Sequence, residues 1–248
     1  MSLIIAAAQS SSVPGDIARN VAHHLRFGLV AAERGVQLLV FPELSLTGYE
    51  LSLARANVVQ LESPALDALR RLAKGAGMTI VVGGPMRGEG NVLHIAAFAL
   101  RPDGSAATYT KEYVHQSEES VFTSGPGGPT LTVEDATVAL AVCADASHAQ
   151  HAARAATRGA SLYAASVMIT DDAYARKTGL LKGYAREHHI AVLMANYSGA
   201  TGGEASAGKS AVWSENGELV AASAGREEEL VIGVKRGEEW QGAVLPVS

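Results

Sequence analysis

The sequence has a single cysteine in 248 residues and no run of apolar residues long enough to cross a bilayer. One cysteine excludes an internal disulfide and a multi-cysteine zinc site, so the composition is typical of a reducing compartment. A membrane-spanning helix needs about 18 or more consecutive apolar residues. The segment 1–16 has a short apolar run but lacks the basic flank of a signal peptide. We therefore expect a cytoplasmic protein with no membrane partner.

Basic charge is also scarce, because 20 lysines and arginines stand against 25 aspartates and glutamates, for a net charge of −5. A surface of this kind does not attract a polyanion, so we expect no nucleic-acid partner. The paired histidines at 23–24 and 188–189 lie in helical patterns, where adjacent side chains face different ways and cannot share a metal ion. The Gly-x4-Gly-Lys-Ser string at 203–210 precedes a hairpin pattern rather than a phosphate-binding helix. No metal and no cofactor is expected.

What the chain does have is a high apolar content, 48% of all residues, which is enough for one large core. Short apolar strands alternate with amphipathic helices, such as the helix predicted over 17–35, which ends at Gly35. The Pro-Asp-Gly turn at 102–104 and the Asn-Gly turn at 216–217 each predict an antiparallel hairpin. No linker divides the sequence, so we predict one domain over 1–248, an α/β fold of layered sheets covered by helices. Strands are expected, among other places, at 3–9, 137–143 and, as the last one, 228–234.

Three residues whose side chains could take part in catalysis directly follow apolar strands. Glu43 follows LLVFP, Lys111 follows AATYT, and Cys143 follows ALAV. In open α/β sheets the functional crevice lies at the carboxyl ends of the strands. Each residue alone has an ordinary structural interpretation, and a lone buried cysteine is commonly a small apolar residue. The three placements together favour a catalytic site.

The order of these residues resembles the nitrilase superfamily of carbon–nitrogen hydrolases. The resemblance lies in VFPELSLTGYE (40–50), YTKEYV (109–114) and LAVCADAS (140–147), with support from GKSAVWSENGELV (208–220). It spans nearly the whole chain. It implies a four-layer α-β-β-α sandwich with two mixed sheets, and assembly into a homodimer or a larger homo-oligomer.

The resemblance also implies roles for individual residues. Cys143 would attack the carbon of a small amide, carbamoyl compound or nitrile and form a thioester, and Glu43 would be the base that takes the thiol proton. Lys111 and the backbone N–H of Ala144 would stabilise the anionic oxygen of the tetrahedral intermediate. The expected reaction releases ammonia or an amine.

The family has a second glutamate between its lysine and its cysteine. In this chain Glu118 and Glu119 are both candidates, and the family's spacing from the lysine favours Glu119 as the residue that orients Lys111 or the substrate. The alternative for the pair is a solvated loop.

The sequence departs from the family where specificity would be set. The aspartate after the nucleophile is kept as Asp145, but the arginine, proline and glutamate that follow it in many relatives are missing. No basic residue is identifiable as a partner for a substrate carboxylate, so a small or neutral acyl group is favoured. Tyr49, Tyr113 and His115 are candidates for the substrate pocket, although core or surface roles are equally open to each. A Cys–His pair with His148 is disfavoured, because the glutamate and lysine already supply a base and a charge.

These observations predict an amidase-type thiol hydrolase that acts on a small-molecule substrate. Nitrile hydrolysis is the nearest alternative. A noncatalytic member of the fold, in which Cys143 is an oxidisable sensor thiol, is the competing class of function.

Overall fold

The computed structural model describes residues 2–247. The helices are α1 (Ile17–Glu33), α2 (Asp67–Ala76), α3 (Ala149–Thr157) and α4 (Asp171–His188). The strands are β1 (Ser2–Gln9), β2 (Leu38–Val40), β3 (Thr79–Arg87), β4 (Leu93–Leu100), β5 (Ala106–Thr110), β6 (Leu131–Val133), β7 (Ala136–Val142), β8 (Leu162–Ser166), β9 (Ala191–Ala195), β10 (Ala200–Thr201), β11 (Glu204–Ala205), β12 (Ala211–Trp213), β13 (Leu219–Ala222), β14 (Glu229–Arg236) and β15 (Glu239–Pro246).

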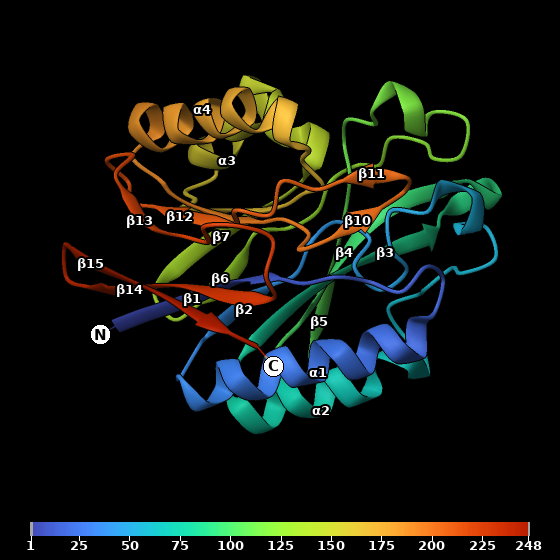
Figure 1. The fold of residues 1–248 in the computed structure, drawn as a ribbon, viewed down its shortest axis with the longest axis horizontal. Coiled ribbons are helices and arrows are strands. Elements are labelled where there is room, and N and C mark those ends of the chain that lie inside the picture. Colours follow the sequence, from blue (N-terminus) through green and yellow to red (C-terminus); the bar gives the residue numbers. More distant parts are fainter. Residues whose placement is uncertain (1, 248) are drawn as a thin grey trace.

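Within residues 2–247 the strands form two large mixed sheets and one small hairpin, β10–β11. The first sheet has seven strands in the order β15-β14-β1-β2-β3-β4-β5, and the second has six in the order β13-β12-β9-β8-β7-β6. Helices α1 and α2 cover the outer face of the first sheet, and α3 and α4 cover the outer face of the second (Figure 1). The predicted four-layer α-β-β-α sandwich is therefore confirmed.

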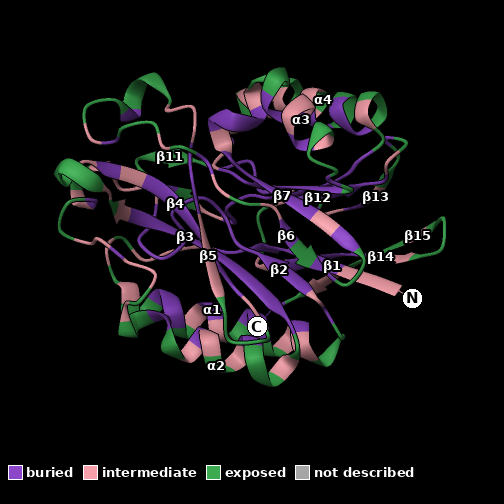
Figure 2. Ribbon diagram, turned by 180° about the vertical axis from the view of Figure 1, so that it is seen from behind, coloured by how far each residue is buried: buried purple, intermediate pink, exposed green. Residues whose placement is uncertain are grey.

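Three apolar cores hold the layers together. One lies between the two sheets, and the other two lie between each sheet and its helices. Figure 2 shows the strands mostly buried, with exposure concentrated on the outer faces of the helices and on the loops. Apolar burial of this extent is the main favourable term in folding. None of the helices in the described range combines the length and the apolar character needed to cross a bilayer.

The predicted helix at 17–35 and the predicted strands at 3–9 and 137–143 correspond to α1, β1 and β7, with ends within two residues of the prediction. Both predicted hairpins form, β4 with β5 and β12 with β13, and both pairs are antiparallel. The expectation that 228–234 is the last strand is wrong, because β15 follows and pairs with β14 along its whole length. Its pattern is hard to read from sequence, since it is an edge strand with mixed exposure. Gly242 lies within this strand at a place that requires glycine, because a Cβ atom there would lie 2.0 Å from the carbonyl oxygen of Val220.

Strand direction brings the candidate residues to one end of the sandwich. In the first sheet β2 is parallel to β3, and β5 has the same direction because β3–β4 and β4–β5 are both antiparallel. In the second sheet β7, β8 and β9 are parallel. The turns after β2, β5 and β7 carry Glu43, Lys111 and Cys143, so the first two come from one sheet and the third from the other.

Candidate active site

Glu43 is buried in a turn that crosses over β3. The Leu46 N–H donates to the carbonyl oxygen of Gly83 in that strand at 2.8 Å. This crossing requires glycine in β3, because a Cβ atom at Gly83 would lie 2.4 Å from the backbone nitrogen of Leu44. From the loop after β9, the Tyr197 hydroxyl donates to the carbonyl oxygen of Glu43 at 2.6 Å. The backbone of Glu43 is thus fixed by both sheets.

Lys111 lies between two buried carboxylates. Its Nζ donates to Glu43 Oε1 at 2.6 Å and to the two carboxylate oxygens of Glu118 at 2.7 and 2.8 Å. The Lys111 side chain is 1% exposed and those of both glutamates 0%. The Tyr49 hydroxyl and the His115 N–H also donate to Glu118, at 2.7 and 2.8 Å. Buried charges are tolerated when they are paired and hydrogen-bonded in this way.

The glutamate that contacts Lys111 is Glu118, so the choice of Glu119 was wrong about the geometry. The Glu119 side chain is exposed, whereas that of Glu118 is buried. Glu118 is the last residue of the short 3₁₀ helix Gln116–Glu118. A local signal for Glu118 exists, because it lies three residues after His115 and its carboxylate returns to the His115 N–H, as in a capping box.

Cys143 begins a 3₁₀ helix, Cys143–Ser147, directly after β7. Its φ of 41° is in the left-handed region, which is uncommon for a residue with a side chain and recurs at functional sites. The thiol is half-buried and its Sγ lies 3.6 Å from the carbonyl oxygen of Met168. Burial, followed by the negative charge of Glu43, raises the pKa of this thiol to about 12, although Lys111 lowers it. A thiol in this state needs a base to become a nucleophile.

Glu43 has the properties of that base. Burial raises its pKa to about 7, against the lowering effect of Lys111 and with a further increase from Glu118. Among the described residues, its Oε2 atom is buried without a hydrogen-bond partner. The pKa of Lys111 lies above its ordinary value, because burial lowers it less than the neighbouring negative groups, Glu43 foremost, raise it. The lysine therefore stays positive while the glutamate can exchange a proton near neutral pH.

The structure also places the remaining candidates. Ala144 is the second residue of the 3₁₀ helix, where backbone N–H groups have no partner within the helix. Tyr49 contacts the site through its hydroxyl, which donates to the Glu118 carboxylate. Tyr113 instead stacks on His148, with ring centroids 3.8 Å apart, and His115 is exposed and pairs with Ser117. His148 is thus occupied by an aromatic contact.

Other kinds of site find no support in the described part of the chain. No group of three or more histidine, cysteine or carboxylate side chains within residues 2–247 converges as metal ligands do. The string at 203–210 leads into strand β12, and its Lys209 donates to Asp171 at 3.2 Å on the surface. A phosphate-binding loop would instead precede a helix.

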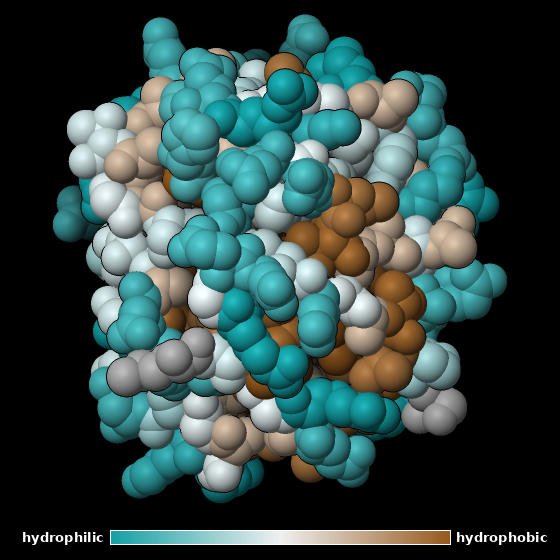
Figure 3. All heavy atoms as spheres, turned by 90° about the vertical axis from the view of Figure 1, so that its left-hand side faces the viewer, coloured by the Kyte–Doolittle hydropathy of each residue, from teal (hydrophilic) through white to brown (hydrophobic). Residues whose placement is uncertain are grey.

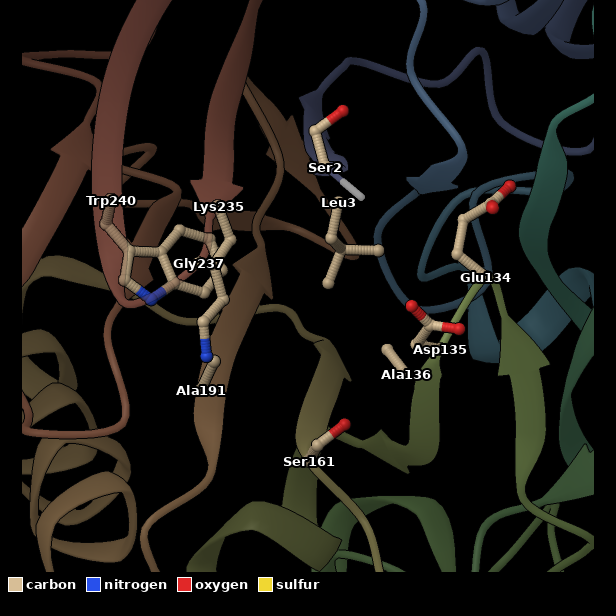
Figure 4. A pocket seen from close by; sticks show the side chains of 10 residues that line it. All are labelled: Ser2, Leu3, Glu134, Asp135, Ala136, Ser161, Ala191, Lys235, Gly237 and Trp240. Atoms are coloured by element: carbon tan, nitrogen blue, oxygen red, sulfur yellow. The ribbon is translucent and has the colours of Figure 1, made fainter.

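A pocket of about 280 Å³ lies at the opposite end of the sandwich. Its lining includes Leu3, Ala136 and Ala191, at the amino ends of β1, β7 and β9, so it is remote from the turns after the strands. Figure 4 shows Lys235 and Trp240 on one side of it and Glu134 and Asp135 on the other. The face of the molecule at this end is mostly hydrophilic, with one gathering of apolar side chains (Figure 3).

Comparison with known proteins gives a consistent result. The family described as carbon-nitrogen hydrolase matches residues 4–238. A protein of Pseudomonas protegens named "Hydrolase in pqqF 5'region" is 26% identical over 227 residues, which cover 89% of this chain and 78% of that protein. A nitrilase of Pyrococcus abyssi is 27% identical over 206 residues, covering 81% and 77%.

Solved structures are similar over almost the whole chain. A mutant of the amidase from Nesterenkonia sp. AN1, in complex with butyramide, is 28% identical with a TM-score of 0.84, covering 93% of this chain and 89% of that one. Another structure of that amidase shows covalent addition of the acetamide moiety of fluoroacetamide at its active-site cysteine.

Proposed function

The chain belongs to the carbon–nitrogen hydrolase family of the nitrilase superfamily, and from this premise we propose that it is an amidase that hydrolyses small amides through a thioester on Cys143. The observation that carries the proposal is the buried ion pair of Glu43 and Lys111, whose two charges both act on the pKa of the only thiol in the chain. These are the groups that acyl transfer to sulfur requires.

In the first half of the proposed reaction, the free Oε2 of Glu43 accepts the thiol proton while Sγ of Cys143 attacks the amide carbon. Negative charge then develops on the amide oxygen, where Lys111 and the Ala144 N–H stabilise it. Glu43 next transfers the proton to the amide nitrogen. The carbon–nitrogen bond breaks, ammonia or an amine leaves, and the acyl group remains on sulfur as a thioester.

In the second half, Glu43 accepts a proton from a water molecule, whose oxygen attacks the thioester carbon. The same cation and N–H group stabilise the second tetrahedral oxygen. Collapse of this intermediate breaks the carbon–sulfur bond, and Glu43 returns the proton to the sulfur of Cys143. The products are a carboxylic acid and the starting enzyme.

The role proposed for Glu118 is to hold Lys111 in place and protonated. Its carboxylate accepts from Lys111, from the Tyr49 hydroxyl and from the His115 N–H, so its own position is fixed by three donors. We infer that the substrate has a small, neutral acyl group, because the charges of the site are already paired with one another. The butyramide complex of the similar amidase supports this class of substrate.

The proposal is tested by ammonia release from a panel of small aliphatic amides, carbamoyl compounds and nitriles. Turnover of amides that is lost in Cys143→Ala and in Glu43→Gln is the expected result. Mass spectrometry of the intact protein should show an acyl adduct on Cys143 in the presence of substrate. Turnover of nitriles alone would instead support the alternative that the nitrilase relative suggests.

A protein inert towards the whole panel, with Cys143 reversibly oxidised to a sulfenic acid by peroxide, would replace this proposal with the sensor function. Assembly into a homodimer and a cytoplasmic location stay predictions from the sequence. Size-exclusion chromatography with light scattering tests the first, and localisation of a tagged protein tests the second.

A further inference from the structure

A buried aspartate beside the nucleophile has no part in the reaction proposed above. Asp145 is 0% exposed and lies in the 3₁₀ helix that begins at Cys143. Its Oδ2 accepts the N–H of Val142, the residue before the nucleophile, at 2.9 Å. The same oxygen accepts the hydroxyl of Tyr109, from strand β5 of the other sheet, at 2.7 Å. This oxygen therefore joins the nucleophile turn to the opposite sheet.

The second oxygen of Asp145 holds the backbone that follows Lys111. Its Oδ1 accepts the N–H groups of Glu112 and Tyr113 at 3.1 and 2.9 Å. One carboxylate thus binds the main chain immediately before Cys143 and the main chain immediately after Lys111. The two turns have no strand pairing with each other, because they belong to different sheets.

A chain of hydrogen bonds extends from this carboxylate to strand β8 of the second sheet. In each of its bonds, only one assignment of donor and acceptor is possible. The single proton of the Tyr109 hydroxyl is donated to Asp145, so Nε2 of His151, 2.8 Å from that hydroxyl, must carry a proton and donate. Burial lowers the pKa of His151 to about 4, so the ring is neutral near pH 7 and its Nδ1 is an acceptor. Nδ1 accordingly accepts from the Tyr163 hydroxyl at 2.8 Å.

We propose that Asp145 is a positioning residue for the hydrolase reaction and that Tyr109 and His151 hold its carboxylate in place. The inference rests on the proposed function for its kinetic consequence, but its geometric consequence concerns the thiol alone. If the Asp145 carboxylate is lost or displaced, the turns that carry Cys143 and Lys111 separate. The thiol then loses the cation that favours its ionised form.

A matched pair of tyrosine variants tests this role. Tyr109→Phe and Tyr163→Phe each remove one hydroxyl, from tyrosines that are 4% and 0% exposed, but only the first hydroxyl contacts Asp145. Two measurements are made on each: the kinetic constants for amide hydrolysis, and the rate of Cys143 alkylation by iodoacetamide as a function of pH. Alkylation reports on one site, because the chain has one cysteine.

We expect Tyr109→Phe to lower kcat about tenfold with KM nearly unchanged, and to slow alkylation by a similar factor at fixed pH, since small displacements of reacting groups have large rate effects. Tyr163→Phe leaves the Tyr109–Asp145 hydrogen bond in place and should lower both rates much less than Tyr109→Phe does, while both variants lower the melting temperature. Asp145→Asn should have a larger effect on both rates, because its NH2 group would face donors at one of the two oxygen positions.

Equal losses in the two tyrosine variants, in proportion to their melting temperatures, would assign this network a purely structural role. Unchanged alkylation in Tyr109→Phe would also overturn the inference, even if amide turnover fell. A wild-type protein without amide turnover, whose alkylation still responds more strongly to Tyr109→Phe than to Tyr163→Phe, would refute the proposed function and retain the positioning role of Asp145.

Discussion

Replacing Glu118 by glutamine tests the electrostatics of the site most directly, and the chain provides its own control in Glu119→Gln. Glutamine keeps the shape of Glu118 and removes its charge. Because the three groups around Glu118 are all donors, the new NH2 group would face at least one of them. Glu119 is exposed, so the same change there should leave activity and stability within experimental error.

The size of the effect follows from the distances. Glu43 and Glu118 each have an oxygen within 2.7 Å of Lys111 Nζ, so these oxygens are at most about 5 Å apart, which at an effective dielectric constant of about 20 gives about 3 kcal/mol of repulsion. The Glu118 charge raises the pKa of Glu43, and its removal should lower that pKa by roughly two units. A displaced Lys111 should stabilise the tetrahedral oxygen less, by about 3 kcal/mol, which corresponds to about a hundredfold decrease in rate.

The assay is kcat/KM for ammonia release from a small amide between pH 5 and pH 9. In the wild type we expect activity to rise as Glu43 loses its proton, with a midpoint near its pKa of about 7. In Glu118→Gln the midpoint should move to lower pH and the plateau should fall. An unchanged profile in Glu118→Gln, or a loss confined to Glu119→Gln, would refute the reasoning.

Three further predictions follow from the same contacts. Gly83→Ala should reduce activity by a factor of about 100 or more, because the new Cβ atom displaces the Glu43 turn. Gly84→Ala is the control and should retain most of the activity, because its Cβ atom would meet no atom closer than 3.4 Å. Steady-state kinetics and melting temperatures compare the two variants. Because the pKa of Glu43 is raised from 4.5 to about 7, the folded state holds this proton more tightly, so its contribution to stability is full below pH 4.5 and is lost as the pH rises to 7 and above. Urea unfolding across this range should show that dependence in the wild type and a weaker one in Glu43→Gln; an equal slope in both would contradict the assignment. Lys209→Ala should leave amide turnover intact and lower the free energy of unfolding by less than about 1 kcal/mol, since the ion pair of Lys209 with Asp171 is exposed. If the wild type binds ATP and this variant does not, the phosphate-loop interpretation would be restored.

Much of the fold could be predicted because its signals are local. Hydrophobic runs define the buried strands, and the turns at 102–104 and 216–217 define two antiparallel hairpins, as the structure confirms. The edge strand β15 could not be predicted, because its residues alternate weakly and its place depends on β14. Strand ends also indicated that Glu43 and Lys111 would lie at the same end of one sheet, where they form an ion pair, and that Cys143 would follow a strand of the fold.

The site could be predicted only as far as each residue's own segment determines it. Glu118 and Glu119 are adjacent and chemically identical. The capping contact of Glu118 with the His115 N–H is local, but the hydroxyl of Tyr49 that also donates to it comes from a loop 69 residues away. The hydrogen bond between Tyr109 and Asp145 joins residues 36 positions apart, and no pattern within either segment predicts it. Contacts of this kind are fixed by the packing of the two sheets and become visible only in the structure.

The site straddles the boundary between two sheets, with the base and the cation on one and the sulfur on the other. The rate of the reaction therefore depends on the relative position of the two sheets. A slip of about 1 Å between them would cost roughly a hundredfold in rate while leaving every strand intact. On heating, the rate of hydrolysis should therefore decrease at a lower temperature than the one at which the circular dichroism of the backbone changes. The loss of activity would report a displacement of one sheet relative to the other before either sheet unfolds.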